Sequence, residues 1–178
     1  MTINCKGELL SMDPPRVMGI LNHTPDSFYE GSRVTEKTLL QRAETMLAQG
    51  ADFIDVGGYS TRPNAPEVSQ TEELSRVVPV VRSLVQHFPE IRISVDTFRS
   101  EVARQSLLEG ACIINDISAG LLDEQMLATV AQFQVPYIAM HLVGTPQTMQ
   151  QHTDYKDIIS DMRYYFSERK AKALQAGI

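Results

Sequence analysis

The chain has 178 residues, of which 43% are hydrophobic and 21% charged, which is ordinary for a soluble globular domain with one sizeable core. Its net charge of −6 and the lack of any basic run argue against nucleic acid as the main partner. No window approaches the roughly 18 apolar residues of a membrane-spanning helix, and the N-terminus lacks a signal-peptide pattern. Membrane insertion is therefore not expected.

Two cysteines indicate the redox setting. Cys5 and Cys112 are far apart in the sequence, and Cys112 falls inside an apolar run. This pattern argues against a disulfide framework and against a thiolate metal site. None of the four histidines has the spacing of a zinc ligand, so no zinc site is predicted. A reducing, cytoplasmic location is expected.

The N-terminal segment is predicted to form a small hairpin. It runs from Thr2 to Met12 and turns at Lys6 and Gly7. A proline-rich break separates it from the first core strand. We expect the hairpin to close the bottom of the fold.

Five short apolar runs follow, each rich in β-branched residues and ending in polar residues or glycine. They lie at 17–21, 53–58, 91–97, 112–116 and 135–141. A helical pattern follows each run. The sequence therefore predicts five repeated βα units.

The five helices have recognisable start and stop signals. The first is expected between the N-cap candidate Thr35 and the stop at Gly50. The second begins at Ser69, with Glu72 at the spacing of a capping box, and Pro79 predicts a kink within it. The remaining three helices are expected from about 99 to 109, 123 to 132 and 155 to 176.

Strict alternation of strands and helices predicts a parallel sheet with right-handed crossovers. This leaves an open doubly wound sheet or a (β/α)₈ barrel, and neither the dinucleotide-binding glycine fingerprint nor a P-loop is present. A complete barrel needs about 250 residues and about eight units. We therefore expect an α/β (β/α)8 TIM barrel, incomplete at the C-terminus. Residues 1–178 would form one domain that supplies an N-terminal hairpin and about the first five βα units.

Four motifs resemble the dihydropteroate synthase family of folate biosynthesis. They are NHTPDSF at 22–28, DVGGYSTRP at 55–63, SVDT at 94–97 and INDI at 114–117. The resemblance implies a pterin-binding barrel that condenses (7,8-dihydropterin-6-yl)methyl diphosphate with 4-aminobenzoate. The products would be 7,8-dihydropteroate and diphosphate, and sulfonamide drugs would mimic the aminobenzoate.

Three residues are implied by this resemblance to contact the pterin. Asp96 and Asn115 end the third and fourth strands, and a carboxylate and an amide suit the donors and acceptors of a pterin edge. Their alternative role is to cap the following helices. Met140 ends the fifth run and lines the pterin cavity in the family, with ordinary core packing as the alternative.

The resemblance also implies a magnesium ion that carries the substrate diphosphate. Its protein ligand would be Asn22, whose carbonyl oxygen is a reasonable ligand for Mg²⁺. The alternative role of Asn22 is to satisfy the turn that precedes Pro25.

The other candidate residues lie on two loops that close over the site in the family. They are the catalytic candidates Asp26, Glu30 and Arg62, and the substrate-binding candidates Phe28, Thr61, Arg62 and Pro63. The acids would stabilise positive charge on the pterin, the arginine would pair with loop carboxylates, and the phenylalanine and proline would form walls of the aminobenzoate pocket. Taken singly, each charged residue is more typical of a solvated loop than of a catalyst.

Some features depart from the family or are absent. Tyr59 stands where glutamate is common, and the family motifs of the last three strands lie beyond residue 178. The chain alone is therefore expected to be inactive, and a homodimer is expected only of the full-length form. Two other hypotheses stay open: a pterin-binding methyltransferase that acts on a corrinoid, and an inactive barrel fragment that serves as a binding module.

Overall fold

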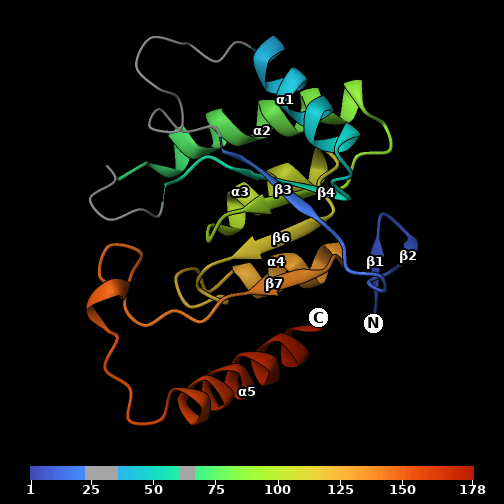
Figure 1. Ribbon diagram of the computed structural model, residues 1–178. Helices are drawn as coiled ribbons and strands as arrows, with labels where there is room; N and C mark the ends of the chain where they lie inside the picture. Colours follow the sequence, from blue (N-terminus) through green and yellow to red (C-terminus); the bar gives the residue numbers. More distant parts are fainter. Residues whose placement is uncertain (23–35, 61–66) are drawn as a thin grey trace.

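A computed structural model describes residues 1–22, 36–60 and 67–178 of the chain (Figure 1). It begins with the expected hairpin, in which β1 (Thr2–Cys5) pairs antiparallel with β2 (Glu8–Ser11). Lys6 and Gly7 form the turn with φ angles of 54° and 83°. Positive φ at both central residues matches the twist of a tight hairpin. The predicted hairpin and its turn are confirmed.

The core of the fold is a five-stranded parallel sheet. Its strands are β3 (Met18–Asn22), β4 (Phe53–Gly57), β5 (Ile93–Asp96), β6 (Ile113–Asp116) and β7 (Tyr137–Ala139). They are hydrogen-bonded in strict chain order, with β3 and β7 at the two edges of the described sheet. A doubly wound sheet reverses its order at a switch point, whereas a barrel wall does not. The order is that of the first part of a (β/α)₈ barrel, as predicted.

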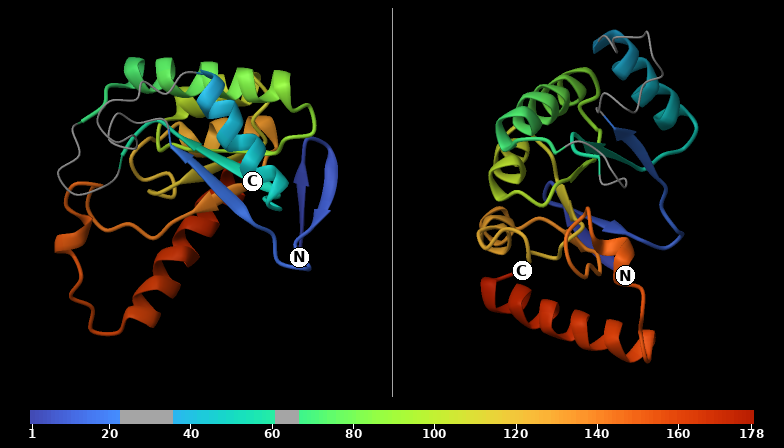
Figure 2. Two further views of the ribbon diagram at one scale, coloured as in Figure 1. Left: turned by 45° about the horizontal axis from the view of Figure 1, so that its top comes forward. Right: turned by 90° about the vertical axis from the view of Figure 1, so that its left-hand side faces the viewer.

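The helices lie outside the curved sheet, and Figure 2 (right) shows them in an arc around it. They are α1 (Glu36–Ala48), α2 (Gln70–His87), α3 (Ser100–Leu108), α4 (Met126–Phe133) and α5 (Ile158–Ala176), with the short 3₁₀ turn η2 (Met149–Gln151) before α5. None of these described helices is long and apolar enough to cross a membrane. The predicted order of elements is confirmed, and Thr35 lies outside the described residues.

Two helices begin later than the sequence predicted. Asp123 does not open α4; its carboxylate accepts hydrogen bonds from the backbone N–H groups of Ser100 (2.6 Å) and Gln125 (2.9 Å). The N-cap of α5 is Asp157, which accepts a bond from the N–H of Ile159 at 3.1 Å. Asp123 holds the turn that precedes α4, whereas Asp157 caps the first turn of α5.

The start of α2 shows only half of the expected capping box. The Ser69 hydroxyl accepts a hydrogen bond from the N–H of Glu72 at 3.2 Å. The Glu72 carboxylate, however, pairs with Arg76 one turn later on the same helix. The helix continues through Pro79 as one element.

The strands divide their side chains between two faces. Those that face the helices form the aliphatic core and are at most 1% exposed: Leu21, Ile54, Val56, Ile93, Val95 and Ile114. Side chains alternate along a strand, so the neighbouring residues face the inside of the curved sheet. These inward residues are mostly polar towards the C-terminal ends of the strands: Asn22, Asp55, Gly57, Ser94, Asp96 and Asn115.

The hairpin covers the other, N-terminal end of the strands, as predicted (Figure 1). A second apolar cluster joins Cys5 of the hairpin to Phe53, Cys112 and Ile113 of the sheet. Both cysteines are free and buried. Burial raises the pKa of both thiols, that of Cys112 to about 12, which keeps them protonated at neutral pH.

Candidate active site

One row of inward-facing residues crosses the C-terminal ends of four strands. The strand register places these residues side by side: Asn22, Gly57, Asp96 and Asn115. Barrels and parallel sheets bind their ligands at this end of the strands. The fold therefore gathers the predicted metal ligand and two of the predicted pterin contacts into one row.

A second inward row lies one layer deeper. It pairs Ile20 with Asp55, and Asp55 with Ser94. Asp55 is 6% exposed and Ser94 is fully buried. The floor of the site therefore combines a buried carboxylate with a buried hydroxyl.

The two rows are connected by a hydrogen bond that spans a whole strand. The side-chain amide of Asn115, on β6, donates from Nδ2 to Oδ2 of Asp55, on β4, over 3.2 Å. Within the described parts of the chain, neither the other carboxylate oxygen of Asp55 nor the Ser94 hydroxyl has a hydrogen-bond partner of good geometry. Burial raises the pKa of Asp55, and the nearby polar groups of Ser94 and Asn115 oppose that rise.

Asp96 occupies the most electrostatically perturbed position of the site. Burial raises its pKa to about 7, and the carboxylates of Asp55, Glu73 and Asp116 add to the rise. Among the described residues, no cation contributes to its pKa. The carboxylate is suited to accept hydrogen bonds from the N–H groups of a ligand, which would stabilise its charged form.

Two adjacent glycines shape the mouth of the site. A Cβ at Gly57 would lie 3.0 Å from Oδ1 of Asn22 and 3.5 Å from Cβ of Asp96, so the missing side chain leaves room between these two groups. A Cβ at Gly58 would lie 2.6 Å from Cγ2 of Val77, a buried residue of α2. Gly57 therefore opens the site, whereas Gly58 lets β4 and α2 approach each other.

Alanine at these two glycines is expected to separate binding from stability. Gly57→Ala crowds only the side chains at the mouth, so pterin binding should weaken about tenfold, the value of about one hydrogen bond, with little change in melting temperature. Gly58→Ala presses on a stiff β-branched side chain and should cost about 1–3 kcal/mol of unfolding free energy. Thermal unfolding and ligand titration measure the two effects, and equal destabilisation by both changes would contradict this assignment.

A buried ionic network that was not predicted from the sequence supports the site from α2. Glu73 is fully buried, its Oε1 accepts a hydrogen bond from the Thr97 hydroxyl at 2.6 Å, and its other oxygen pairs with Arg99. Arg99 also donates to the carbonyl oxygen of Val68 at 2.6 Å. Its guanidinium lies 5.4 Å from the ring centroid of Tyr59. The residues just after β5 are thereby fixed to the start of α2.

A signal for this network was present in the sequence. Glu73 lies at helical spacing from Val77, Val80 and Val81, on the buried stripe of α2. A carboxylate on an apolar stripe requires a buried partner.

Asp116 supports the fold, and the hydrogen bonds described for its side chain go to the turn after β6 and to β7. Its carboxylate accepts bonds from the N–H and hydroxyl of Ser118 at 2.7 and 2.8 Å, the N–H of Gly120 at 2.8 Å and the hydroxyl of Tyr137 at 2.6 Å. All of its strong acceptor positions are used. It holds the turn after β6 against β7.

The remaining predicted residues fall into two groups. Met140 follows β7, is 38% exposed and belongs to neither hydrophobic cluster, so the core-packing alternative is wrong and its contact with pterin stays a prediction. The other six lie outside the described residues: Asp26, Phe28, Glu30, Thr61, Arg62 and Pro63. Ile138, which is not among the predicted site residues, pairs with Asn115 and places an apolar side chain beside the row.

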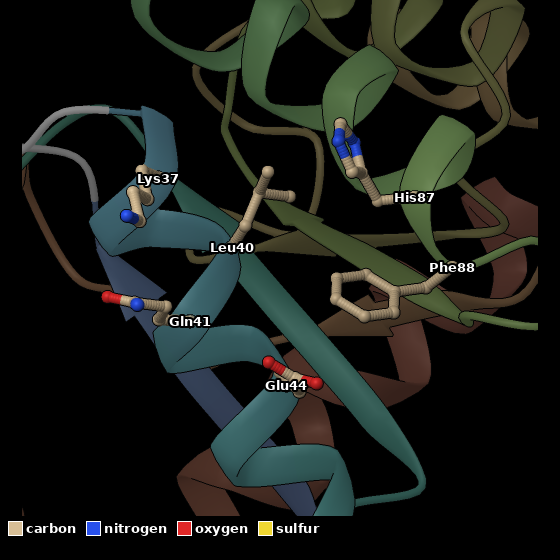
Figure 3. Close-up of a pocket in the computed structure, with 6 residues that line it drawn as sticks. All are labelled: Lys37, Leu40, Gln41, Glu44, His87 and Phe88. Atoms are coloured by element: carbon tan, nitrogen blue, oxygen red, sulfur yellow. The ribbon is translucent and has the colours of Figure 1, made fainter.

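A separate groove of about 480 Å³ lies on the outside of the fold (Figure 3). It is formed by one side of α1 and the end of α2, with Leu40, Glu44 and Phe88 among its lining residues. It shares no residue with the two inward rows. We therefore place the candidate active site at the strand ends.

Comparison with known proteins gives a consistent result. The family described as pterin binding enzyme matches residues 18–178. Dihydropteroate synthase of Synechocystis is 48% identical over 163 residues, which cover 91% of this chain and 56% of the relative. The chain therefore spans little more than half the length of this relative.

Solved structures show the same extent of similarity. The Yersinia pestis dihydropteroate synthase in complex with a sulfonamide drug has a TM-score of 0.91 at 42% identity. The matched region covers 100% of this chain and 64% of the Yersinia pestis chain. The Xanthomonas albilineans dihydropteroate synthase with 4-aminobenzoic acid has a TM-score of 0.88 at 39% identity, over 99% of this chain and 62% of its own.

Proposed function

This chain belongs to the family of pterin binding enzymes, and we propose that it forms the pterin-binding part of a dihydropteroate synthase. The whole enzyme would join (7,8-dihydropterin-6-yl)methyl diphosphate to 4-aminobenzoate. The observation that carries the proposal is the inward row at the strand ends, in which Asp96 and Asn115 lie side by side. The similarity to synthases, one with 4-aminobenzoic acid and one with a sulfonamide drug, supports the same reaction.

The chemistry of the row matches a pterin. One edge of the pterin ring offers an amino group and ring nitrogens, which require acceptors and a donor in one plane. Asp96 supplies acceptors, and Asn115 supplies an acceptor and an N–H. Ile138 beside Asn115 gives apolar surface for the flat ring.

The reaction is a substitution at the pterin methylene. The amine nitrogen of 4-aminobenzoate forms a C–N bond, the C–O bond to diphosphate breaks, and the amine gives up a proton. The described residues contribute by binding and orienting the pterin, so that the methylene faces the incoming amine. The anionic Asp96 next to the ring also favours the positive charge that develops as diphosphate leaves.

We further propose Asn22 as a ligand of Mg²⁺ that accompanies the diphosphate. Its Oδ1 lies beside Gly57, where the missing side chain leaves room for an ion. An amide oxygen is a suitable single ligand for an ion that keeps waters and phosphate oxygens in its other positions. Bound Mg²⁺ would offset the repulsion between the diphosphate and the carboxylates of this site.

The activity is tested by joining the chain to the C-terminal part of the Synechocystis relative. We expect the chimaera to release diphosphate only when both substrates and Mg²⁺ are present, and the 178-residue chain alone to release none. The chimaera without 4-aminobenzoate is the control. A folded chimaera that binds neither 7,8-dihydropteroate nor the pterin diphosphate would refute the proposed function.

A further inference from the structure

We propose that Asp55 is a positioning residue, which fixes the atoms that Asn115 presents to the ligand. The inference rests on the proposed pterin site and deepens it. Asp55 itself is not expected to contact the substrate. Its role would be to determine which donor and acceptor atoms the site presents to the ligand.

The geometry gives Asp55 a direct hold on Asn115. The two residues belong to β4 and β6, with β5 between them, and yet Nδ2 of Asn115 lies 3.2 Å from Oδ2 of Asp55. The residue of β5 that pairs with Asp55 is Ser94. Its small side chain leaves space for the contact to pass over the middle strand.

The chemistry of the contact allows one orientation of the amide. An ionised carboxylate only accepts hydrogen bonds, so the Asn115 amide must turn its NH₂ group towards Asp55. The opposite orientation would bring the amide oxygen against a carboxylate oxygen. The carbonyl oxygen of Asn115 and its second N–H are then left for the ligand. They match a donor amino group next to an acceptor ring nitrogen, the arrangement of an aminopyrimidine edge.

The burial of Asp55 points to a role beyond filling space. Its side chain is 6% exposed, and its Oδ1 lacks a hydrogen-bond partner of good geometry. A buried carboxylate costs stability compared with an apolar side chain of similar volume. Buried polar groups of this kind require an explanation, and the orientation of Asn115 supplies one.

The test compares two neutral replacements of Asp55. Both are made in the full-length protein, which consists of residues 1–178 and any natural sequence that adjoins them. Asp55→Asn keeps an oxygen that accepts from Asn115 in one of two nearly equal orientations, so the Kd for 7,8-dihydropteroate should rise only about twofold. Asp55→Leu removes the acceptor and frees the amide. The freed side chain of Asn115 must then be immobilised when the ligand binds, which weakens affinity by about three- to tenfold.

Two readouts separate positioning from a structural role. We expect KM for the pterin substrate to rise in Asp55→Leu while KM for 4-aminobenzoate stays unchanged. The side-chain NH₂ signal of Asn115 in ¹⁵N NMR without ligand should lose its hydrogen-bonded shift in Asp55→Leu and keep it partly in Asp55→Asn. Glu101→Gln, which neutralises an exposed carboxylate of α3, is the matched control and should leave both readouts as in the wild type.

The outcomes are distinct. Equal weakening by Asp55→Asn and Asp55→Leu would show that the charge of Asp55 matters and not its hold on Asn115, which would overturn the inference. Wild-type affinity in both variants would overturn it as well. If Asp55→Leu does not fold, Asp55→Ala replaces it in the same comparison. Failure of the wild-type protein to bind 7,8-dihydropteroate would instead refute the proposed function, and the NMR signal would still report the orientation of Asn115.

Discussion

Replacing Asp96 with asparagine is expected to weaken pterin binding strongly and to stabilise the fold at the same time. The carboxylate accepts ligand N–H groups, and a hydrogen bond to a charged group contributes about 1.5–3 kcal/mol. The amide keeps one acceptor oxygen and replaces the other with an NH₂ group, and the loss of one such bond weakens binding by about 10- to 100-fold. The amide keeps the shape of the side chain, so the loss reports the chemistry of Asp96 and not a cavity.

The stability gain has a defined cause. Asp96 is charged next to the carboxylates of Asp55, Glu73 and Asp116, and its pKa is raised to about 7 by burial and by these neighbours. A neutral amide removes both the burial penalty of the charge and the repulsion. The expected gain at pH 8 is on the order of 2 kcal/mol, after allowance for the solvent that reaches this side chain.

The stability difference between Asp96→Asn and the wild type is expected to grow as pH rises. The folded protein holds the Asp96 proton up to about pH 7, whereas the unfolded chain releases it near the ordinary aspartate pKa of 3.8. Between these two values the folded state binds more protons, so the contribution of Asp96 to stability falls as pH rises. The Asp96→Asn variant should match the wild type near pH 4 and exceed it increasingly up to pH 8. Melting temperatures across this range measure the difference, and a constant difference would contradict the raised pKa.

The general architecture of the site was predictable because it follows from side-chain periodicity. Asp96 and Asn115 stood at the ends of apolar runs, and the family resemblance added Asn22. The strand register places all three in one row, with Gly57 between Asn22 and Asp96. The same period of two explains why Asp116, next to Asn115, makes its contacts away from the inward rows. The structural role of Asp116 is evident only from its hydrogen bonds in the turn after β6, which no spacing in the sequence reveals.

Contacts across the fold were not predictable in the same way. The hydrogen bond from Asn115 to Asp55 joins residues 60 positions apart on strands that are not neighbours. The bond depends on the small size of Ser94 on the strand between them. The sequence motifs do not show that these three residues meet. Glu73 was accessible in principle as a charge on an apolar stripe, but its partner Arg99 lies beyond the next strand.

The largest loss of stability is expected from Arg99→Met. Glu73 is fully buried, and the Arg99 side chain is its cationic partner. Removing one member of a buried ion pair leaves an uncompensated charge and costs about 3–5 kcal/mol. The contact of Arg99 with the ring of Phe98, 5.0 Å from its centroid, adds a smaller loss.

A double-mutant cycle distinguishes this network from simple packing. Glu73→Leu combined with Arg99→Met replaces the pair by apolar groups, and such replacements are often close to neutral. The double variant should therefore be more stable than Arg99→Met, with a coupling of about 2 kcal/mol or more in urea unfolding. Arg104→Met, which breaks the exposed pair with Glu101 on α3, should cost about 1 kcal/mol or less. A loss for Arg99→Met as small as that of Arg104→Met would mean that water reaches Glu73, and that the start of α2 is not held to the end of β5 by a buried charge.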